Sequence, residues 1–405
     1  MFRFGPPLPA EALFDREKEW QALEHALRSL TKGARTDYAL IGVRRVGKTS
    51  ILNKVVEDAP RFRVIPIFVN CEGLRLDEFI ALLGSTITQR FIDSLDLKEG
   101  VGYRLQEAVN KTPREAMAAL SEMLGSVRTL RLKLAADYIE LLLELKKKQE
   151  LGPLKKEGCR SYLEDTLNLA EKIARKHQKF FVVVLDEFQT TAAYHPEFFA
   201  WMRRNTQSHT RVAYIVSGSN IGMMKDIVLD YQKPFGGNFM VQWIAPFGRE
   251  TAVRFLKKSF AEEKMPISDE ATNEIVSFTG GYPAYLNWIG ERCVLARRTD
   301  RVYIRELEME IFKPTNLGYL FEREVARLRK TGETKTFEVL RCMARQGISS
   351  PSQIARYIGG ITASNTINYL RRLERYGYVQ RTGKGRYAIL DPMLEKYLKE
   401  ETRVY

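Results

Sequence analysis

The sequence predicts an α/β fold in which a parallel sheet carries helices on both faces and smaller helical segments follow it. Four short apolar runs, Tyr38–Ile41, Val64–Val69, Phe180–Leu185 and Val212–Val216, lack polar alternation, which is typical of strands buried on both faces. Helical sequence separates these runs, and parallel strands need such crossovers. A length of 405 residues exceeds one usual domain of about 100–200 residues, so we expect more than one domain.

The composition is that of a globular chain. Hydrophobic residues make up 44% and charged residues 28%, which excludes a wholly disordered or fibrous protein. The longest apolar run, Phe180–Leu185, is far shorter than the ~20 residues of a membrane span, and the amino terminus shows no secretory pattern. We therefore expect a cytoplasmic protein without a membrane partner.

Cysteine spacing and net charge narrow the chemistry further. Cys71, Cys159, Cys293 and Cys342 form no C-x-x-C pair and have no histidine cluster near them, so neither a zinc site nor a disulfide framework is expected. Lysines and arginines number 64 against 50 acidic residues, a net charge of +14. Such an excess favours attraction to polyanions such as nucleic acid, although charge alone does not establish a partner.

One segment between a predicted strand and a predicted helix fits the pattern G-x-x-x-x-G-K-[ST] in full. Its glycines let backbone N–H groups face phosphate oxygens, while Lys48 reaches the β and γ phosphates and the Thr49 hydroxyl coordinates magnesium. The sequence thus predicts a binding site for ATP or ADP with Mg²⁺. The residues of this site are Gly42, Val43, Arg44, Arg45, Val46, Gly47, Lys48, Thr49 and Ser50.

An acidic pair follows the strand Phe180–Leu185. Asp186 is expected at the carboxyl edge of the sheet, where it can hold hydrated Mg²⁺, and Glu187 can orient and deprotonate an attacking water. Together with Lys48, these acids are the predicted catalytic residues. The next strand ends in small polar residues that either sense the γ-phosphate or form a plain turn. The sensor candidates are Ser217, Ser219 and Asn220, without a choice among them.

The last 75 residues, 331–405, predict three helices and a β-hairpin, the pattern of a winged helix-turn-helix. They hold thirteen lysines and arginines against seven acidic residues, so the basic excess concentrates there. Either this segment binds double-stranded DNA, or it docks on the preceding domains and restrains them. The nucleic-acid candidates are Asn365, Asn368, Arg371, Arg372, Arg375, Lys384 and Arg386.

Five segments occur together in a characteristic combination. They are Phe14–Glu17 (FDRE), the loop GVRRVGKTS, the strand VVVLDEFQ, the segment VSGSN and Gly280–Leu286 (GGYPAYL). With the terminal winged helix, this set resembles the archaeal P-loop ATPase family of the AAA+/STAND group, over nearly the whole chain. The resemblance implies an ATPase core with a helical lid. It also implies that Phe14 and Arg16, together with Tyr282 and Pro283, flank the adenine.

Two features depart from that family. Asn238 falls where the family often has an arginine after the sensor strand, so slow intrinsic hydrolysis is expected. The helical stretch Phe79–His177 is longer than an ordinary crossover, with Thr112–Glu115 and Ser161–Glu164 as expected capping boxes. Its apolar positions either pack on the sheet or on each other, or bind a protein partner. They include Leu134, Tyr138, Leu142 and Leu145.

We therefore expect three domains: an ATPase core over 1–245 with a helical insertion at about 79–177, a helical lid over 246–330, and a winged helix over 331–405. The predicted function is a Mg-dependent, nucleotide-controlled switch whose winged helix binds DNA. One alternative is a slow signalling ATPase in which the winged helix clamps the core and the partner is a protein. A second is a nucleotide-regulated transcription factor. A DNA-associated motor or loader is less favoured, because the arginine is missing.

Overall fold

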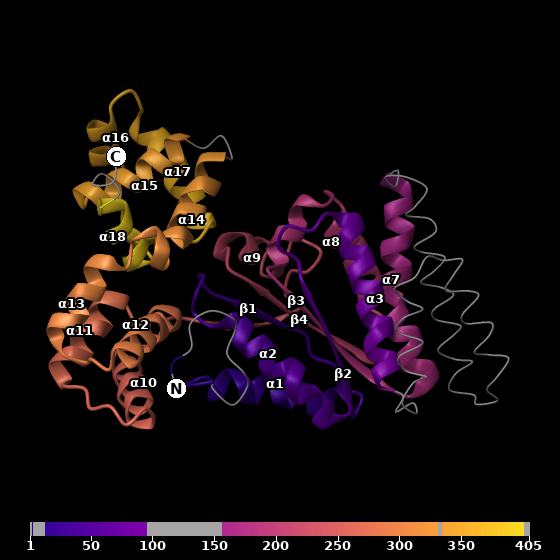
Figure 1. Ribbon diagram of the computed structural model, residues 1–405. Coiled ribbons are helices and arrows are strands. Elements are labelled where there is room, and N and C mark those ends of the chain that lie inside the picture. Colours follow the sequence, from indigo (N-terminus) through magenta and orange to yellow (C-terminus); the bar gives the residue numbers. More distant parts are fainter. Residues whose placement is uncertain (1, 3–12, 95–155, 331–333, 401–405) are drawn as a thin grey trace.

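The computed structural model describes residues 2, 13–94, 156–330 and 334–400, and its ribbon is shown in Figure 1. The central feature of these residues is a five-stranded sheet in which every pairing is parallel, as predicted. In spatial order its strands are β2 (Val64–Asn70), β3 (Phe180–Asp186), β4 (Val212–Gly218), β1 (Tyr38–Ile41) and β5 (Met240–Trp243).

Strand β5 at the edge of the sheet has no counterpart among the predicted strands. It is only four residues long, and its terminal side chains Met240 and Trp243 are 59% and 50% exposed. A strand without a buried apolar run gives no signal in a sequence pattern.

Helices cover both faces of the sheet (Figure 1). Along β3, Val182 and Val184 belong to the apolar cluster on one face, and Val183 and Leu185 to the cluster on the other. This double burial explains the uninterrupted apolar sequence of the strand. One face carries α1 (Glu17–Leu30), α2 (Lys48–Asp58) and the turn η2 (Ala59–Phe62). The other carries α3 (Leu76–Asp93), α7 (Lys156–His177), η3 (Phe188–Ala193), α8 (Phe198–Thr206) and α9 (Ile221–Val228).

The described parts of the predicted helical insertion are α3 and α7, which pack against each other. The predicted N-cap at Ser161 is wrong, because α7 already begins at Lys156. Glu164 instead accepts a hydrogen bond from Arg160 one turn earlier (Nε–Oε1, 3.0 Å). The box Thr112–Glu115 and the positions Leu134, Tyr138, Leu142 and Leu145 lie outside the described residues.

A group of helices follows β5 and corresponds to the expected lid. Ser268 caps α11 by accepting from the Ala271 N–H, and the helix ends at Gly280 in the left-handed conformation, as its sequence predicts. The helices are α10 (Arg249–Glu262), α11 (Asp269–Thr279), α12 (Pro283–Ala296), α13 (Arg301–Glu310), η4 (Pro314–Gly318) and α14 (Tyr319–Lys330).

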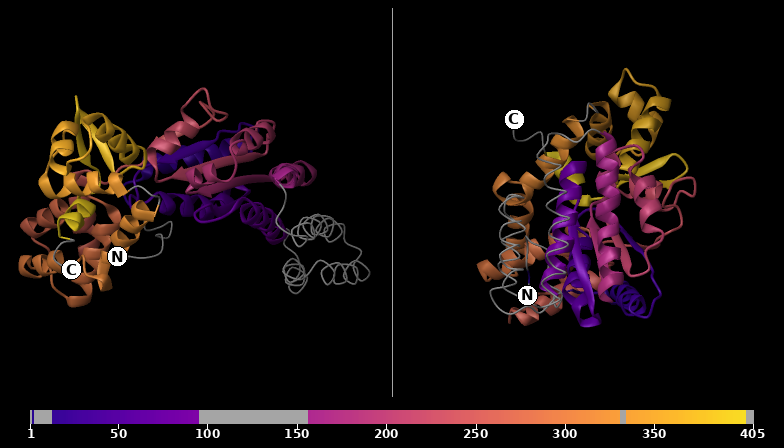
Figure 2. Two further views of the ribbon diagram at one scale, coloured as in Figure 1. Left: turned by 90° about the horizontal axis from the view of Figure 1, so that it is seen from above. Right: turned by 90° about the vertical axis from the view of Figure 1, so that its right-hand side faces the viewer.

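The carboxyl-terminal segment is a winged helix, as predicted. Three helices precede an antiparallel hairpin, and an additional helix follows it. These elements are α15 (Thr334–Gln346), α16 (Pro351–Ile358), α17 (Ala363–Arg375), β6 (Val379–Gly383), β7 (Arg386–Ile389) and α18 (Pro392–Glu400). The left view in Figure 2 shows this segment beside the lid, at one end of the sheet.

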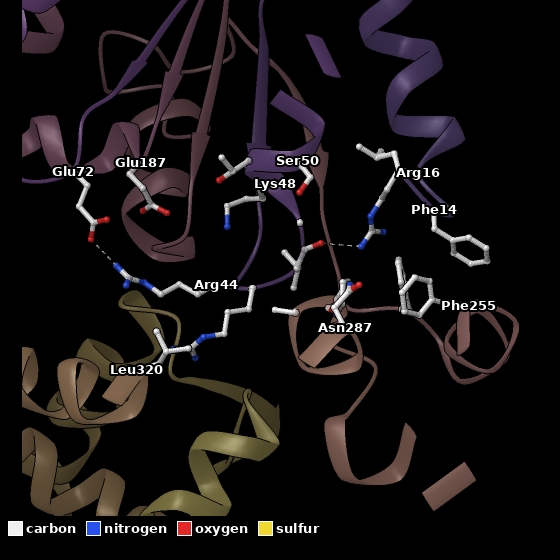
Figure 3. A pocket seen from close by; sticks show the side chains of 18 of the residues that line it. Phe14, Arg16, Arg44, Lys48, Ser50, Glu72, Glu187, Phe255, Asn287 and Leu320 are labelled. Atoms are coloured by element: carbon white, nitrogen blue, oxygen red, sulfur yellow. Dashed lines mark hydrogen bonds and ion pairs between the residues drawn. The ribbon is translucent and has the colours of Figure 1, made fainter. Parts of the chain in front are cut away.

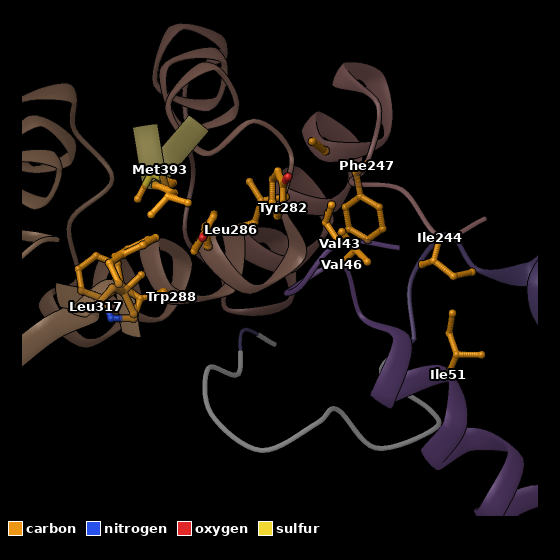
Figure 4. Packing of buried hydrophobic residues seen from close by; sticks show 14 of the residues in the cluster. Val43, Val46, Ile51, Ile244, Phe247, Tyr282, Leu286, Trp288, Leu317 and Met393 are labelled. Carbon is orange, nitrogen blue, oxygen red and sulfur yellow. The ribbon is translucent and has the colours of Figure 1, made fainter. Parts of the chain in front are cut away.

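One apolar cluster connects the sheet, the lid and the winged helix. It extends from Ile51 on α2 through Val46 and Phe247 to Tyr282 on the lid and Met393 on α18 (Figure 4). The expected boundaries after residues 245 and 330 remain predictions, and this buried packing crosses both of them.

The described residues contain no helix that is both long and apolar enough to cross a bilayer.

A buried histidine in the segment between α8 and β4 predicts a measurable pH dependence of stability. His209 is 4% exposed and bonds to the Tyr214 hydroxyl and the Asn168 amide, both at 3.1 Å. Burial lowers its pKa to about 4, whereas an unfolded histidine titrates near ~6.5. The unfolded chain therefore binds the proton first, so this contribution is complete above pH 6.5 and declines as the pH falls towards 4.

We expect urea unfolding to report about 2 kcal/mol less stability from this histidine at pH 5 than at pH 7. His209→Gln removes this contribution to the pH dependence, whereas the same change at the exposed His25 retains it. Equal pH dependence in the wild type and His209→Gln would show that the histidine is not the cause.

Candidate active site

The predicted phosphate loop joins β1 to α2 and is shaped by its two glycines. Gly47 is the N-cap of α2 and has φ +93°. Residues other than glycine rarely adopt this backbone conformation. A Cβ atom on Gly42 would lie 2.1 Å from the Ile244 carbonyl oxygen, so only glycine fits there. The loop therefore brings its backbone, followed by the first N–H groups of α2, to the carboxyl edge of the sheet, where a phosphate binds favourably.

Lys48 is buried beneath this loop, with 5% of its surface exposed. Its ammonium group donates to the Gly42 and Val43 carbonyl oxygens, each at 2.9 Å. Burial lowers the pKa of Lys48, while the nearby Glu187 and Asp186 carboxylates oppose that shift. A buried cation is costly without a close counter-ion, and a nucleotide phosphate would supply one.

Asp186 lies between two hydroxyl groups. The Thr49 hydroxyl donates to its Oδ2 at 2.7 Å, and the Ser217 hydroxyl donates to its Oδ1. This arrangement follows from the sheet order, because β4 lies between β1 and β3 and places Ser217 between the loop and the acid. Thr49 and Asp186 both offer hard oxygen atoms, the ligand type that Mg²⁺ prefers, so this pair fits the predicted metal.

Glu187 is held by two neighbours at the end of β3. Its carboxylate accepts a hydrogen bond from the Ser219 hydroxyl at 2.6 Å and another from the Gln189 amide at 2.5 Å. Burial alone would raise its pKa, but Lys48 and these hydrogen bonds keep the pKa below its ordinary value. The carboxylate is therefore ionised at neutral pH, as a base acting on water must be.

Gln189 was missed as a site residue by the sequence reasoning. It follows the acidic pair by two positions, within the segment VVVLDEFQ, and is 4% exposed. A polar side chain so close to a strand that ends in two acids was the available signal.

A cavity of about 410 Å³ lies above the loop (Figure 3). Lys48 and Glu187 lie toward one side of it and Phe14 and Phe255 toward the other, so it has a charged end and an apolar end. The predicted residues that line it are Phe14, Arg16, Arg44, Arg45, Val46, Gly47, Lys48, Thr49, Ser50, Glu187 and Pro283. The lining residues that were not predicted are Leu13, Glu72, Phe247, Phe255, Ala284, Asn287, Tyr319 and Leu320.

Arg16 holds the amino-terminal segment against the phosphate loop. Its guanidinium donates to the Val46 carbonyl at 3.1 Å and to the Ala245 carbonyl at 2.7 Å. It also lies 4.9 Å from the centre of the Phe247 ring. These contacts place Phe14 at the apolar end of the cavity, the end that suits a nucleotide base.

Several predicted residues lie outside the cavity lining. Gly42 and Val43 begin the loop beneath it, and Asp186 and Ser217 lie behind Thr49. Ser219 reaches the cavity only through Glu187. Asn220 caps α9 by accepting from the Met223 N–H at 3.1 Å. Tyr282, expected beside the adenine, is buried instead and donates its hydroxyl hydrogen to the Leu390 carbonyl at 2.9 Å.

Arg45 of the loop connects the cavity to the lid and the winged helix. Its guanidinium donates to the Tyr285 hydroxyl at 2.9 Å and pairs with Glu324 and Asp391, each at 3.3 Å. The Tyr285 hydroxyl in turn donates to Asp391 at 2.5 Å. The Arg45 side chain is only 13% exposed. Burial alone would lower its pKa, but the surrounding tyrosine and carboxylates raise it, so the guanidinium remains charged.

The nucleic-acid candidates divide into two groups. Arg375 pairs with Asp226 of α9 at 2.8 Å, and its Cα lies so close to Gly222 that a Cβ there would be 2.4 Å away. The Arg375 side chain is nevertheless 56% exposed, so its assignment as a groove-facing residue stays a prediction. The other six candidates, which are also exposed, are Asn365, Asn368, Arg371, Arg372, Lys384 and Arg386.

The parallel sheet, the phosphate loop and the terminal segment define a P-loop nucleoside triphosphatase fold with a winged helix. The model of a family described as an ATPase domain predominantly from Archaea matches residues 13–289, more than half of the chain. The chain therefore belongs to this family of ATPases, which confirms the predicted resemblance. A second model, that of the IclR helix-turn-helix domain, matches residues 334–383.

Individual proteins resemble this chain at low sequence identity. An uncharacterized protein of Methanocaldococcus jannaschii is 24% identical over 255 residues, or 59% of this chain, and the chain spans about half of its length (54%). The Walker-type ATPase paby2304 of Pyrococcus abyssi is 22% identical, with a TM-score of 0.66 over 98% of this chain and 99% of that one. The ORC2 protein of Aeropyrum pernix is 11% identical, with a TM-score of 0.55 over 99% and 98%.

Proposed function

We propose that this archaeal-type ATPase is a Mg-dependent switch in which bound ATP controls the position of the winged helix. One observation carries the proposal: Arg45 lines the nucleotide cavity and also bonds to Asp391, which precedes α18. A side chain of the loop that must adjust to phosphate is thus in direct contact with the winged-helix segment.

The residues of the site support binding followed by hydrolysis. Lys48 exchanges its bonds to the Gly42 and Val43 carbonyls for phosphate oxygens of the nucleotide. Thr49 and Asp186 would hold Mg²⁺, which neutralises charge on the phosphates when bound. Glu187, ionised and next to the cavity, orients and deprotonates the attacking water.

Coupling to the winged helix follows from competition for Arg45. A triphosphate in the cavity offers this arginine an anion in addition to Glu324 and Asp391. Any turn of the guanidinium towards phosphate weakens its bond to Asp391 and loosens the winged helix. Hydrolysis and release of phosphate then restore the contact.

Turnover without a partner is proposed to be slow. Asn238, in the position expected for an arginine, donates its amide hydrogens to the Pro234 and Gly236 carbonyls at 3.4 and 3.2 Å. Its side chain thus stabilises its own turn and carries no charge for a phosphate. Where an arginine finger exists, it contributes about 10³- to 10⁵-fold in rate.

Glu187→Gln should separate binding from hydrolysis. The amide retains the size of the carboxylate but cannot take a proton from water, so ATP should still raise the melting temperature while phosphate release falls by about 10²-fold or more. A phosphate-release assay and a thermal melt measure the two effects. Gln189→Ala, which removes only a neighbour of Glu187, should reduce turnover less. Unchanged turnover in Glu187→Gln would remove this residue from the mechanism.

We propose double-stranded DNA as the partner of the exposed face formed by α17 and the hairpin. Arg371→Ala and Lys384→Ala should each weaken duplex binding and reduce the slope of log affinity against log salt by about one unit. Fluorescence anisotropy with labelled duplex at several salt concentrations measures this, with ATP and with ADP. Binding that is independent of the nucleotide would contradict a switch.

The internal clamp is the second candidate, and the ion pair between Arg375 and Asp226 favours it. In that case α17 stays on α9, and no duplex binds even at low salt. Asp226→Asn tests the point, because it frees Arg375 without altering the winged helix. Stronger duplex binding by this variant would support the DNA-bound output, and continued absence of binding would support the clamp.

A further inference from the structure

A second cavity lies at the edge of the sheet opposite to the phosphate loop. Its volume is about 1050 Å³, and it lies at the amino ends of β2 and β3, where Val64 and Phe180 begin the two strands. The ends of α1, α3 and α7 and the turn η2 complete its described walls. We call it the basal cavity. The loop containing Lys48 follows the carboxyl end of β1, so the basal cavity is separate from the nucleotide site.

The basal cavity is strongly basic. Six lysines and arginines line it but only one carboxylate, Asp93, whereas the whole chain has 64 basic and 50 acidic residues. Two of the six have acidic partners: Arg28 pairs with Glu24 at 2.6 Å, and Arg61 with Asp58 at 2.7 Å. The other four form no ion pair within the described part of the chain. They are Lys32, Arg63, Arg90 and Lys179.

Such a group of cations favours the binding of an anionic partner from outside the described residues. Like charges around one cavity repel each other, and a polyanion that binds there reduces this repulsion. Binding also releases the counter-ions of the polyanion into solution. His177 lies in the same cavity, and its pKa is lowered mainly by burial and further by Lys176 and Lys179.

Aromatic rings accompany the charges. Phe62 and Phe180 both line the cavity and are partly exposed. The Arg28 guanidinium lies 4.6 Å from the centre of the Phe62 ring, and the Arg211 guanidinium lies 4.9 Å from that of Phe180. A basic groove with rings and stacked guanidinium groups is how proteins hold unpaired nucleotides without reading their sequence.

We propose that the basal cavity binds single-stranded nucleic acid, with backbone phosphates on Lys32, Arg63, Arg90 and Lys179 and bases against Phe62 and Phe180. The volume is more than twice the 410 Å³ of the nucleotide cavity, which suits several linked nucleotides and not one mononucleotide. Bases of a duplex are already stacked on each other and cannot use the rings. This site is independent of the switch and of the winged helix.

The test uses the full chain and a labelled single strand of about 12 nucleotides, within the site sizes of ~4 to 16 that single-strand binders show. The double variant Lys32→Glu, Arg90→Glu should weaken binding about tenfold or more at low salt and lower the salt dependence by about 0.7 per lost phosphate contact. The matched control Lys233→Glu, Arg204→Glu makes the same charge change at exposed positions elsewhere. It should bind as the wild type does.

Two further measurements keep the outcome clear. ATP should raise the melting temperature of both double variants equally, which shows that they are folded and separates this site from the switch. Arg371→Ala, Lys384→Ala should retain single-strand binding, which separates it from the winged helix. The proposal is overturned by equal affinity in both double variants, by displacement of the strand with inorganic tripolyphosphate at equal phosphate concentration, or by preference of the cavity for duplex.

Discussion

Arg45→Ala is expected to lower the free energy of unfolding by about 3–5 kcal/mol at neutral pH. The change removes the only cation from the buried cluster that Arg45 forms with Glu324 and Asp391. Both carboxylates, whose side chains are 6% and 15% exposed, then lack a counter-ion. Burial already raises the pKa of Glu324 above its ordinary value. Because a carboxyl with a raised pKa takes up a proton first in the folded state, the loss of stability should shrink as the pH falls through that pKa. Urea unfolding at several pH values measures both effects.

A neutral triple variant provides the control for this prediction. Arg45→Met with Glu324→Gln and Asp391→Asn removes all three charges together. No carboxylate is then left buried without a counter-ion, so this variant should lose less stability than Arg45→Ala. The Asp391→Asn change retains the side-chain oxygen that accepts from the Met393 and Leu394 N–H groups at the start of α18. A loss below about 0.5 kcal/mol in Arg45→Ala would mean that the arginine does not hold the winged helix.

Lys48→Ala is expected to abolish the stabilisation that ATP gives. A ligand present at a hundred times its Kd adds about 2.7 kcal/mol to the folded state, and this variant should gain none of it. Lys48 is buried and its ammonium donates to two loop carbonyls, and alanine leaves the phosphates without this charge. Thermal melts with and without Mg-ATP are compared within each variant, so any intrinsic effect of the substitution cancels.

Lys233→Ala serves as the matched control, since this lysine is exposed in the loop after α9. It should retain the full ATP effect. A Lys48→Ala variant that is still stabilised by ATP would place the nucleotide elsewhere.

The phosphate loop and the acidic strand were predictable because their chemistry is local in the chain. Gly42, Lys48 and Thr49 occupy one short segment, and Asp186 follows a run of apolar residues that only a buried strand explains. The bond between Thr49 and Asp186 at 2.7 Å joins two segments that the motifs had already indicated. The geometry is compatible with the predicted roles, which await the experiments above.

The contacts of Arg45 were not predictable, since its partners lie 240 to 346 residues further along the chain. No spacing rule relates a loop arginine to Glu324 or Asp391. The same limit applies to Tyr282, whose motif suggested contact with the base but whose hydroxyl bonds to Leu390. Local patterns define each element, whereas the packing of one element on another depends on the whole chain.

The continuous apolar cluster from α2 to Met393 bears on how this architecture can diversify. A recombination event that replaced the terminal segment with a foreign DNA-binding module would expose Tyr282 and Leu286 to water and leave Arg45 without Asp391. The incoming module would need an apolar residue and an acid in the same places. New specificity is therefore expected to arise by point substitution on the outer surface of α17, while residues of the junction change together.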